Sequence, residues 1–298
     1  MKAFFKLTKP GISLFVMISG LAGYAISLPF HRSIDLTVPC LLIFGLYLVS
    51  AGSFALNQAQ EWRLDQMMPR TSMRPLPRGD MSLMQVYLIA ALCLLFGLLF
   101  LLLLNPWSAL LSLITVVFYN GFYTLLWKRR LAFAAVPGAI PGAMPVLVGY
   151  SVNSLVLWRP DCVYLFLIMF LWQMPHFWAL SVRYKDDYAK AGFPVLPNKI
   201  GVKRTIYYIG LYTFAYVALA LSAPIFVPAH YLQVFLVIPI AFKVLWEFFK
   251  YYKSSELAPE NRIQWLPFFL WTNLSMLVFI CAPVFDRWCF YFMSGRGA

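Results

Sequence analysis

The chain of 298 residues is 62% hydrophobic and 12% charged, with a mean hydropathy of +0.74. This composition excludes an ordinary soluble domain, because so large an apolar excess has to face lipid. The formal net charge is +13, but the basic residues lie between apolar runs, where membrane topology explains them, so we expect no nucleic-acid partner. The five cysteines are scattered without a C-x-x-C spacing, so neither a disulfide framework nor a zinc site is expected.

In chain order, nine apolar segments of about 20 residues are long enough to cross a bilayer. We therefore predict an all-α, multi-pass membrane protein that forms a single transmembrane domain over residues 1–298. A bacterial cytoplasmic (inner) membrane is the simplest location. The predicted spans are 11–30, 36–57, 82–104, 107–127, 132–152, 160–182, 204–226, 230–250 and 264–286.

The distribution of charge predicts the orientation. Most basic residues fall in the N-terminal segment and in alternate loops, so the N-terminus is predicted to be cytoplasmic and the C-terminus to lie outside. Two cytoplasmic connections are long, about 58–81 and 183–203, and loops of that length are usually functional. The basic residues assigned to the outer side are Arg32, Arg159, Arg287 and Arg296.

The end of the second span carries the first polar cluster. Asn57, Glu61 and Asp65 recur every four residues, which places them on one face of a helix. Two carboxylates and an amide oxygen suit a hard cation such as Mg²⁺ that keeps positions for phosphate. Arg70 and Arg74 follow in the loop and could hold the anion. The alternative is that these charges are only the solvated end of a helix.

The connection after the sixth span carries a second cluster. Asp187 stands beside Arg183 and Lys185 and repeats the grouping of acid and base on the same side of the membrane. If the two loops face each other, Asp187 could share one or two metal ions with Glu61 and Asp65. A snorkelling interfacial loop is the competing interpretation.

Two polar residues, Gln173 and His176, lie several residues inside the sixth span. Polar side chains at that depth are costly and often functional, although His176 could equally pair with backbone carbonyls freed by Pro175. The fourth span ends in Tyr123 and Lys128, where a cluster of aromatic anchors and cations is the simpler account.

The fifth span contains three prolines and two glycines between Pro137 and Pro145. These residues are expected to break or thin the helix and to let something bulky approach its backbone.

Taken together, these residues resemble the UbiA-type intramembrane prenyltransferases. The resemblance covers nearly the whole chain, and the Trp-Gln-x-Pro-His-Phe run separates a haem-modifying branch from quinone-making relatives. The residues that carry it are Asn57, Glu61, Asp65, Arg70-Thr71, Arg74–Pro77, Tyr123-Thr124, Trp127–Arg129, Trp172–Phe177, Asp187-Tyr188 and Ala191–Pro197.

The resemblance implies that farnesyl diphosphate alkylates the 2-vinyl group of haem B, with water added, to give haem O and diphosphate. Mg²⁺ is the implied cofactor and haem B a substrate. The implied catalytic metal ligands are Asn57, Glu61, Asp65 and Asp187, the diphosphate-binding residues are Arg70, Arg74, Lys128, Arg183 and Lys185, and the haem-binding residues are Gln173, His176 and Tyr123.

Two positions depart from the family's usual pattern. Glu61 stands where the first motif usually has Asp, which alters the reach of the carboxylate more than its chemistry. Arg183 stands where the wider superfamily has the first Asp of its second motif, which leaves a second metal ion poorly supported.

Two other functions remain open at this stage. One is a UbiA-type enzyme that prenylates an aromatic or quinone-precursor acceptor. The other is a transporter of an anionic lipid or metabolite, although transporter sites usually lie near the membrane midplane and these polar residues concentrate at one rim. For the haem-modifying enzyme, the expected partners are the lipid bilayer and a downstream haem A synthase or terminal oxidase assembly.

Overall fold

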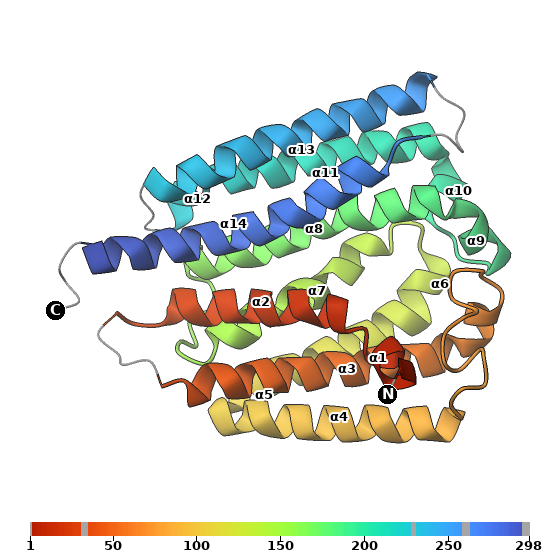
Figure 1. Ribbon diagram of the computed structural model, residues 1–298, viewed down its shortest axis with the longest axis horizontal. Helices are drawn as coiled ribbons and strands as arrows, with labels where there is room; N and C mark the ends of the chain where they lie inside the picture. Colours follow the sequence, from red (N-terminus) through yellow and green to blue (C-terminus); the bar gives the residue numbers. More distant parts are fainter. Residues whose placement is uncertain (1, 31–34, 228–230, 258–262, 294–298) are drawn as a thin grey trace.

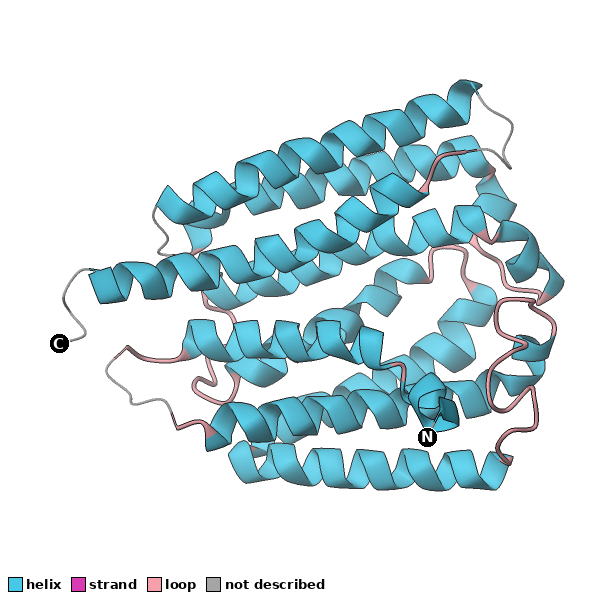
Figure 2. Cartoon of the chain, viewed as in Figure 1, coloured by secondary structure: helices cyan, strands magenta, loops and turns pink. Residues whose placement is uncertain are grey.

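The computed structural model of the chain describes residues 2–30, 35–227, 231–257 and 263–293, and within these ranges helices are joined by mostly short connections (Figures 1 and 2). The helices are α1 (Lys2–Thr8), α2 (Pro10–Ser27), α3 (Thr37–Gln66), α4 (Leu83–Leu104), α5 (Pro106–Val116), the π-helix η1 (Val117–Trp127), α6 (Lys128–Arg130), α7 (Ala135–Tyr150), α8 (Pro160–Arg183), α9 (Lys185–Lys190), α10 (Leu196–Ile200), α11 (Val202–Leu221), α12 (Ala223–Phe226), α13 (Tyr231–Leu257) and α14 (Leu266–Met293).

Each of the nine predicted spans coincides with a helix or, for the fourth, with the continuous run α5–η1–α6. By length and composition, seven helical segments of the described chain can cross a membrane. The all-α, multi-pass membrane architecture is therefore confirmed, while the number nine and the side of the N-terminus stay predictions. The seven segments are Pro10–Ser27, Thr37–Asp65, Leu83–Leu104, Pro106–Arg130, Pro160–Arg183, Leu232–Leu257 and Leu266–Met293.

The long helices form two groups that share a central seam. In the first group α2 packs on α3 and α7, α3 on α4, and α5 on α4 and α7; in the second, α8, α11, α13 and α14 pack on one another. Contacts of α7 with α8 and of α2 with α14 join the groups. Figure 1 shows α4 at one edge of the bundle and α13 at the other.

The outer helices present apolar side chains to their surroundings, as lipid-facing helices must. Along α4, Leu88, Leu95 and Leu103 are exposed, and α13 exposes Phe235 and Phe242. Because water would penalise such surfaces and lipid does not, these faces are the lipid contacts of the bundle.

The two long connections are more helical than predicted. Helix α3 continues to Gln66, so the first connection begins after that residue and not at 58. The second, predicted as a loop over 183–203, contains α9 and α10. In the last turns of α3 and in α10, buried side chains pack against neighbouring elements and stabilise the additional helical turns.

Helix α7 is continuous, so the predicted break by its prolines was wrong. Pro137, Pro141 and Pro145 are four residues apart, so the three positions that lack a backbone N–H lie along one face of the helix. Neighbouring helices surround the backbone there. The predicted close approach is present, because a Cβ on Gly138 would lie 2.5 Å from the Tyr123 ring and a Cβ on Gly142 would collide with the Gln173 amide.

Candidate functional site

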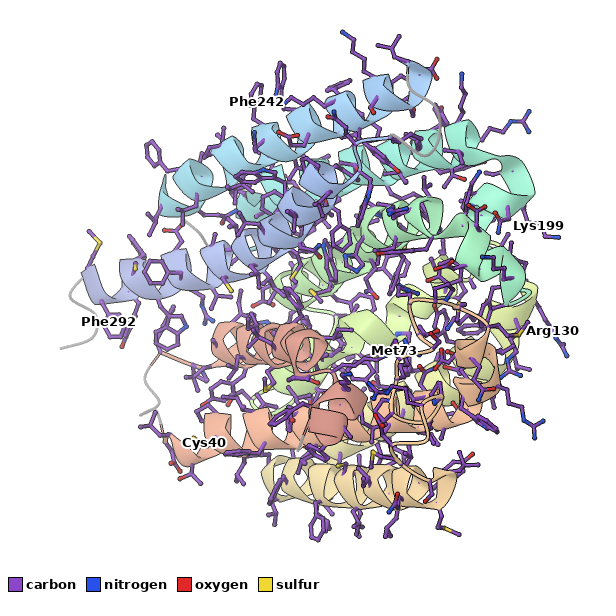
Figure 3. All side chains as sticks on the ribbon, turned by 45° about the vertical axis from the view of Figure 1, so that its right-hand side comes forward. Cys40, Met73, Arg130, Lys199, Phe242 and Phe292 are labelled. Atoms are coloured by element: carbon purple, nitrogen blue, oxygen red, sulfur yellow. The ribbon has the colours of Figure 1, made fainter. Side chains whose placement is uncertain are left out.

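The first polar cluster lies on the last turns of α3. Asn57, Glu61 and Asp65 are 4%, 2% and 1% exposed, so the two carboxylates are withdrawn from solvent at one end of the bundle. The end is shared by α6, α9 and α10, as Figure 1 shows. In Figure 3 the labelled side chains Arg130 and Lys199 lie at this end.

Each buried carboxylate has a cationic partner. The Lys128 ammonium donates to both carboxylate oxygens of Glu61, at 2.8 and 2.7 Å. One guanidinium nitrogen of Arg74 lies 2.7 and 2.6 Å from the two oxygens of Asp65. Because an unpaired buried charge is strongly unfavourable, each ion pair offsets part of the cost of burying its carboxylate.

A ladder of polar contacts joins α3 to η1 and to Lys128, the first residue of α6 directly after it. Three contacts succeed one another at steps of four residues on both helices, and every contact joins residues 67 apart in the sequence. Four-residue steps follow one face of each helix, so the contacts hold the two helices in one register. The bonded pairs are Ser53–Asn120 at 2.5 Å, Asn57–Thr124 at 3.1 Å and Glu61–Lys128 at 2.8 Å.

The Thr124 hydroxyl fixes the orientation of Asn57. It donates to the carbonyl of Tyr119, five residues earlier as the π-helix allows, and accepts from the Asn57 amide nitrogen. The bond to Thr124 uses the amide nitrogen of Asn57, so the amide oxygen is the atom left for a cation.

The two predicted polar segments face each other. Arg70 donates to the Tyr188 hydroxyl at 3.1 Å and its guanidinium lies over the Tyr184 and Tyr188 rings, at 4.8 and 5.5 Å from their centroids. Met68 packs against Phe193 in a small apolar cluster beneath these contacts. The two segments therefore face each other, which is the condition that a shared site requires.

Asp187 lies half-buried on α9. Within the described ranges, no three His, Cys, Asp or Glu side chains converge as a metal site would require. Asp187 as a further ligand beside Glu61 and Asp65 therefore stays a prediction. Arg183 is exposed with its guanidinium 5.5 Å from the Tyr184 ring centroid, and Lys185 lies on the first turn of α9.

Lys9 is a member of the site that sequence reasoning missed. It precedes α2, and burial lowers the pKa of its amine to about 7; Arg74 and Lys128 lower that pKa further, whereas Asp65 and Glu61 oppose the shift. The amine therefore lies within electrostatic reach of both ion pairs. A lysine before Pro10 was the one available signal, because no sequence pattern marks which way that side chain points.

Tyr123 lines a pocket of about 60 Å³ between η1, α7, α8 and the segment around Phe193. The Lys128 side chain reaches the same pocket, with its ammonium 4.7 Å from the Phe193 ring centroid. Lys128 thus stands between this pocket and the acidic face of α3.

Gln173 and His176 occupy different surroundings on α8. The Gln173 amide nitrogen donates to the carbonyls of Ala139 and Met169, at 3.0 and 2.9 Å, so it joins α7 to α8. The His176 ring lies between Trp172 and Phe269, with centroids 4.8 Å away on each side. Its buried Nδ1 has no hydrogen-bond partner in the part of the chain that the structure describes.

The sequence of this chain is similar to those of known membrane prenyltransferases. The profile of the UbiA prenyltransferase family matches residues 16–273. A protohaem IX farnesyltransferase of Bdellovibrio bacteriovorus is 48% identical over 287 residues, which cover 96% of this chain and 97% of that protein. One of the same name from Streptomyces avermitilis is 40% identical over 223 residues, or 70% and 68% of the two chains.

Solved structures share the fold at low sequence identity. A digeranylgeranylglyceryl phosphate synthase superposes with a TM-score of 0.73 at 21% identity, covering 95% of this chain and 98% of that one. A UbiA homologue from Archaeoglobus fulgidus bound to DMAPP and Mg²⁺ gives a TM-score of 0.67 at 17% identity, with 94% and 98% covered.

Proposed function

The chain belongs to the UbiA prenyltransferase family, and on that premise we propose that it transfers a farnesyl group from farnesyl diphosphate to the 2-vinyl group of protohaem IX, with water added, to give haem O and diphosphate. It is a membrane-embedded prenyltransferase. The observation that carries the reaction is the meeting of two buried carboxylates and an amide with Lys128 and Arg74 at one end of an apolar bundle.

The cations of the site would bind the diphosphate. Lys128 and Arg74 are already paired with acids at 2.7 and 2.6 Å, and a phosphate oxygen entering between the helices could share these donors. Arg70 lies over the second segment and adds a planar guanidinium suited to two phosphate oxygens. Arg183 and Lys185 are proposed for the outer rim of the same anion site.

The donor set fits a magnesium ion. Asn57, Glu61 and Asp65 offer an amide oxygen and two carboxylates from successive turns of one helix, which are the oxygen ligands that Mg²⁺ prefers. Asp187 is proposed as a fourth ligand from the facing segment. When bound, magnesium would neutralise charge on the leaving diphosphate.

The apolar interior has a separate task. The C–O bond of farnesyl diphosphate breaks and its electron pair stays with diphosphate, so the allylic carbon becomes electron-poor. Packed helices keep stray water from that carbon. The vinyl group of haem then attacks it, one water molecule adds to the resulting cation, and a proton is released.

Haem recognition is proposed for His176. Its Nδ1 is buried without a partner, and an imidazole nitrogen in that state is suited to ligate iron. Tyr123 lines a pocket beside the acidic face and is proposed to contact haem. Gln173 is also proposed for haem, through its amide oxygen, since its nitrogen is used between α7 and α8.

We propose the bacterial inner membrane as the location, with the acidic face on the cytoplasmic side. The two connections that bear basic residues both lie at that end. A haem A synthase or a terminal oxidase assembly is the proposed recipient of the product.

The test is a pigment extract from membranes that express this chain in a host without its own haem O synthase. The wild type is expected to produce haem O and Asp65→Asn to produce none. Asp80→Asn, in which the altered side chain is 36% exposed and pairs with Arg78, is the matched control and should retain activity.

If the folded wild type makes no haem O, the acceptor is wrong and quinone precursors should be offered instead. Mg²⁺-dependent product formation in detergent, without any gradient, would separate an enzyme from a transporter of anionic lipids.

A further inference from the structure

Lys9 has a backbone conformation that few residues adopt. Its φ and ψ are 47° and 61°, and it has a positive φ that no other non-glycine residue of the described chain shares. This left-handed conformation is unfavourable for a side-chain-bearing residue, and more so before Pro10, because a residue preceding proline favours extended backbone. Strain of this kind persists only where the surroundings fix it, and it gathers at functional sites.

Hydrogen bonds on both sides hold this conformation. The Lys9 N–H donates to the Phe5 carbonyl at 3.1 Å, and the Lys9 carbonyl accepts from Ile12 and Ser13 at 2.9 and 3.1 Å. Gln58 of α3 donates to the Leu7 carbonyl at 2.7 Å and ties α1 to the same helix that bears the acidic face. The turn at Lys9 is therefore fixed by α1, α2 and α3 together.

The turn points the Lys9 side chain at α3. Its ammonium lies 5.3 Å from the ring centroid of Phe54, which precedes Asn57 by three residues on the same helix. Residues at this spacing share a face, so the ammonium lies on the face that bears Glu61 and Asp65.

Lys9 differs from the other cations of that face. Lys128 and Arg74 each pair with a carboxylate. No salt bridge or hydrogen bond joins the Lys9 ammonium to another side chain in the ranges that the structure describes, and its contact there is the Phe54 ring. Lys9 is half-buried, so its cation is partly withdrawn from water without a direct ion-pair partner. An incoming anion would reduce the cost of that desolvation.

Depth along α3 indicates which part of the anion Lys9 meets. At 1.5 Å per residue, Phe54 lies about 5 Å deeper in the bundle than Asn57 and about 16 Å deeper than Asp65. A prenyl chain lies in the apolar interior and its diphosphate points toward the polar end. Of the two phosphate groups, the one attached to the prenyl chain therefore lies nearer to the level of Phe54.

We propose that Lys9 binds the chain-bearing phosphate of the prenyl diphosphate and donates a hydrogen bond to the oxygen that leaves when the C–O bond breaks. This proposal rests on the function proposed above. The electron pair of the broken bond remains on that oxygen, and the ammonium lowers its energy without giving up a proton. Lys9 would thus act on the reacting bond, whereas Arg74 and Lys128 act further toward the polar end.

Three variants separate the charge of Lys9 from its backbone. Lys9→Met keeps the length and the strain and removes the charge. Lys9→Gly removes the side chain and relaxes the strain, because glycine adopts a positive φ without cost. Lys9→Arg keeps a cation. Lys6→Met is the matched control, because Lys6 is an exposed lysine on α1.

Two quantities should be measured in detergent at saturating Mg²⁺: the affinity for inorganic diphosphate and the kcat for farnesyl transfer. For Lys9→Met and Lys9→Gly we expect diphosphate affinity to fall about tenfold and kcat about 100-fold or more, as for loss of a donor to a developing anion. Lys9→Arg should retain affinity, and Lys6→Met should match wild type.

Wild-type affinity for diphosphate in Lys9→Gly would overturn the proposal. The proposal would also fail if Lys9→Met lost diphosphate affinity and Lys9→Gly had it restored, because the backbone conformation and not the charge would then be responsible. Binding of inorganic diphosphate does not involve haem. Hence, if wild type makes no haem O but the Lys9 variants still lose affinity, the acceptor is wrong while the role of Lys9 stands.

Discussion

The Lys128 ammonium lies 2.7 Å from a carboxylate oxygen of Glu61, although 67 residues separate them. The carboxylate is 3% and the lysine side chain 23% exposed. The contact joins the acidic face of α3 to α6, which directly follows η1. The same cation therefore stabilises the fold and, in the proposed enzyme, supplies charge to the site. These two roles can be separated experimentally.

Lys128→Met should leave the Glu61 carboxylate buried without a partner. We expect a loss of stability of about 3 kcal/mol, the cost of breaking a largely buried ion pair. In the double variant Glu61→Gln/Lys128→Met the buried charge is gone, so stability should largely return while farnesyl transfer stays absent. Thermal unfolding in detergent and haem O formation measure the two effects. A double variant as unstable as the single one would contradict this account.

Thr124→Val keeps the shape of the side chain and removes the hydroxyl that accepts from Asn57. Stability should fall by only about 1 kcal/mol. The Mg²⁺ concentration for half-maximal activity should rise at least about tenfold, because groups that orient metal ligands have effects of that size. Thr115→Val on α5, where the lost bond is to the Leu111 carbonyl, should leave the Mg²⁺ dependence unchanged.

Gly142→Ala adds a methyl group where the Gln173 amide already lies. The amide must move, and with it the bonds to Ala139 and Met169, so we expect a loss of about 1–3 kcal/mol. Gly121→Ala is the control, because a Cβ there meets nothing within 4 Å. Adding Gln173→Ala to Gly142→Ala should recover part of the stability; no recovery would show that the strain lies elsewhere.

His176→Phe preserves an aromatic ring between Trp172 and Phe269 and removes the unpartnered nitrogen. If His176 ligates haem iron, the variant should fold normally, bind haem more weakly and change the haem absorption spectrum. A titration of detergent-solubilised protein with haem measures both. Unchanged affinity and spectrum would assign His176 to helix packing.

Parts of the site could be predicted from the sequence because they repeat within one helix. Asn57, Glu61 and Asp65 recur every four residues, and a helix turns such a spacing into a face whatever surrounds it. Likewise, apolar length and loop charge predict helices that lie in lipid and a polar end where both long connections meet.

The remaining features depend on contacts between distant segments. The pairing of Lys128 with Glu61 requires a π-helix whose register no local pattern marks, and Lys9 enters the site only through an unusual φ. The prolines of α7 indicated a break when considered alone. Packing against α2, α5 and α8 keeps that helix continuous.

The constant separation of 67 residues along the ladder restricts how this chain can change in length. Extra residues between Arg74 and the start of α4 lie outside both ladder helices and beyond the Arg70 and Arg74 contacts, so a longer connection there would leave every ladder partner in place. A single residue deleted within Val117–Trp127 would instead shift the later partners by one position and turn Lys128 away from Glu61. Insertions and deletions should therefore be tolerated in that part of the connection and rejected within the π-helix.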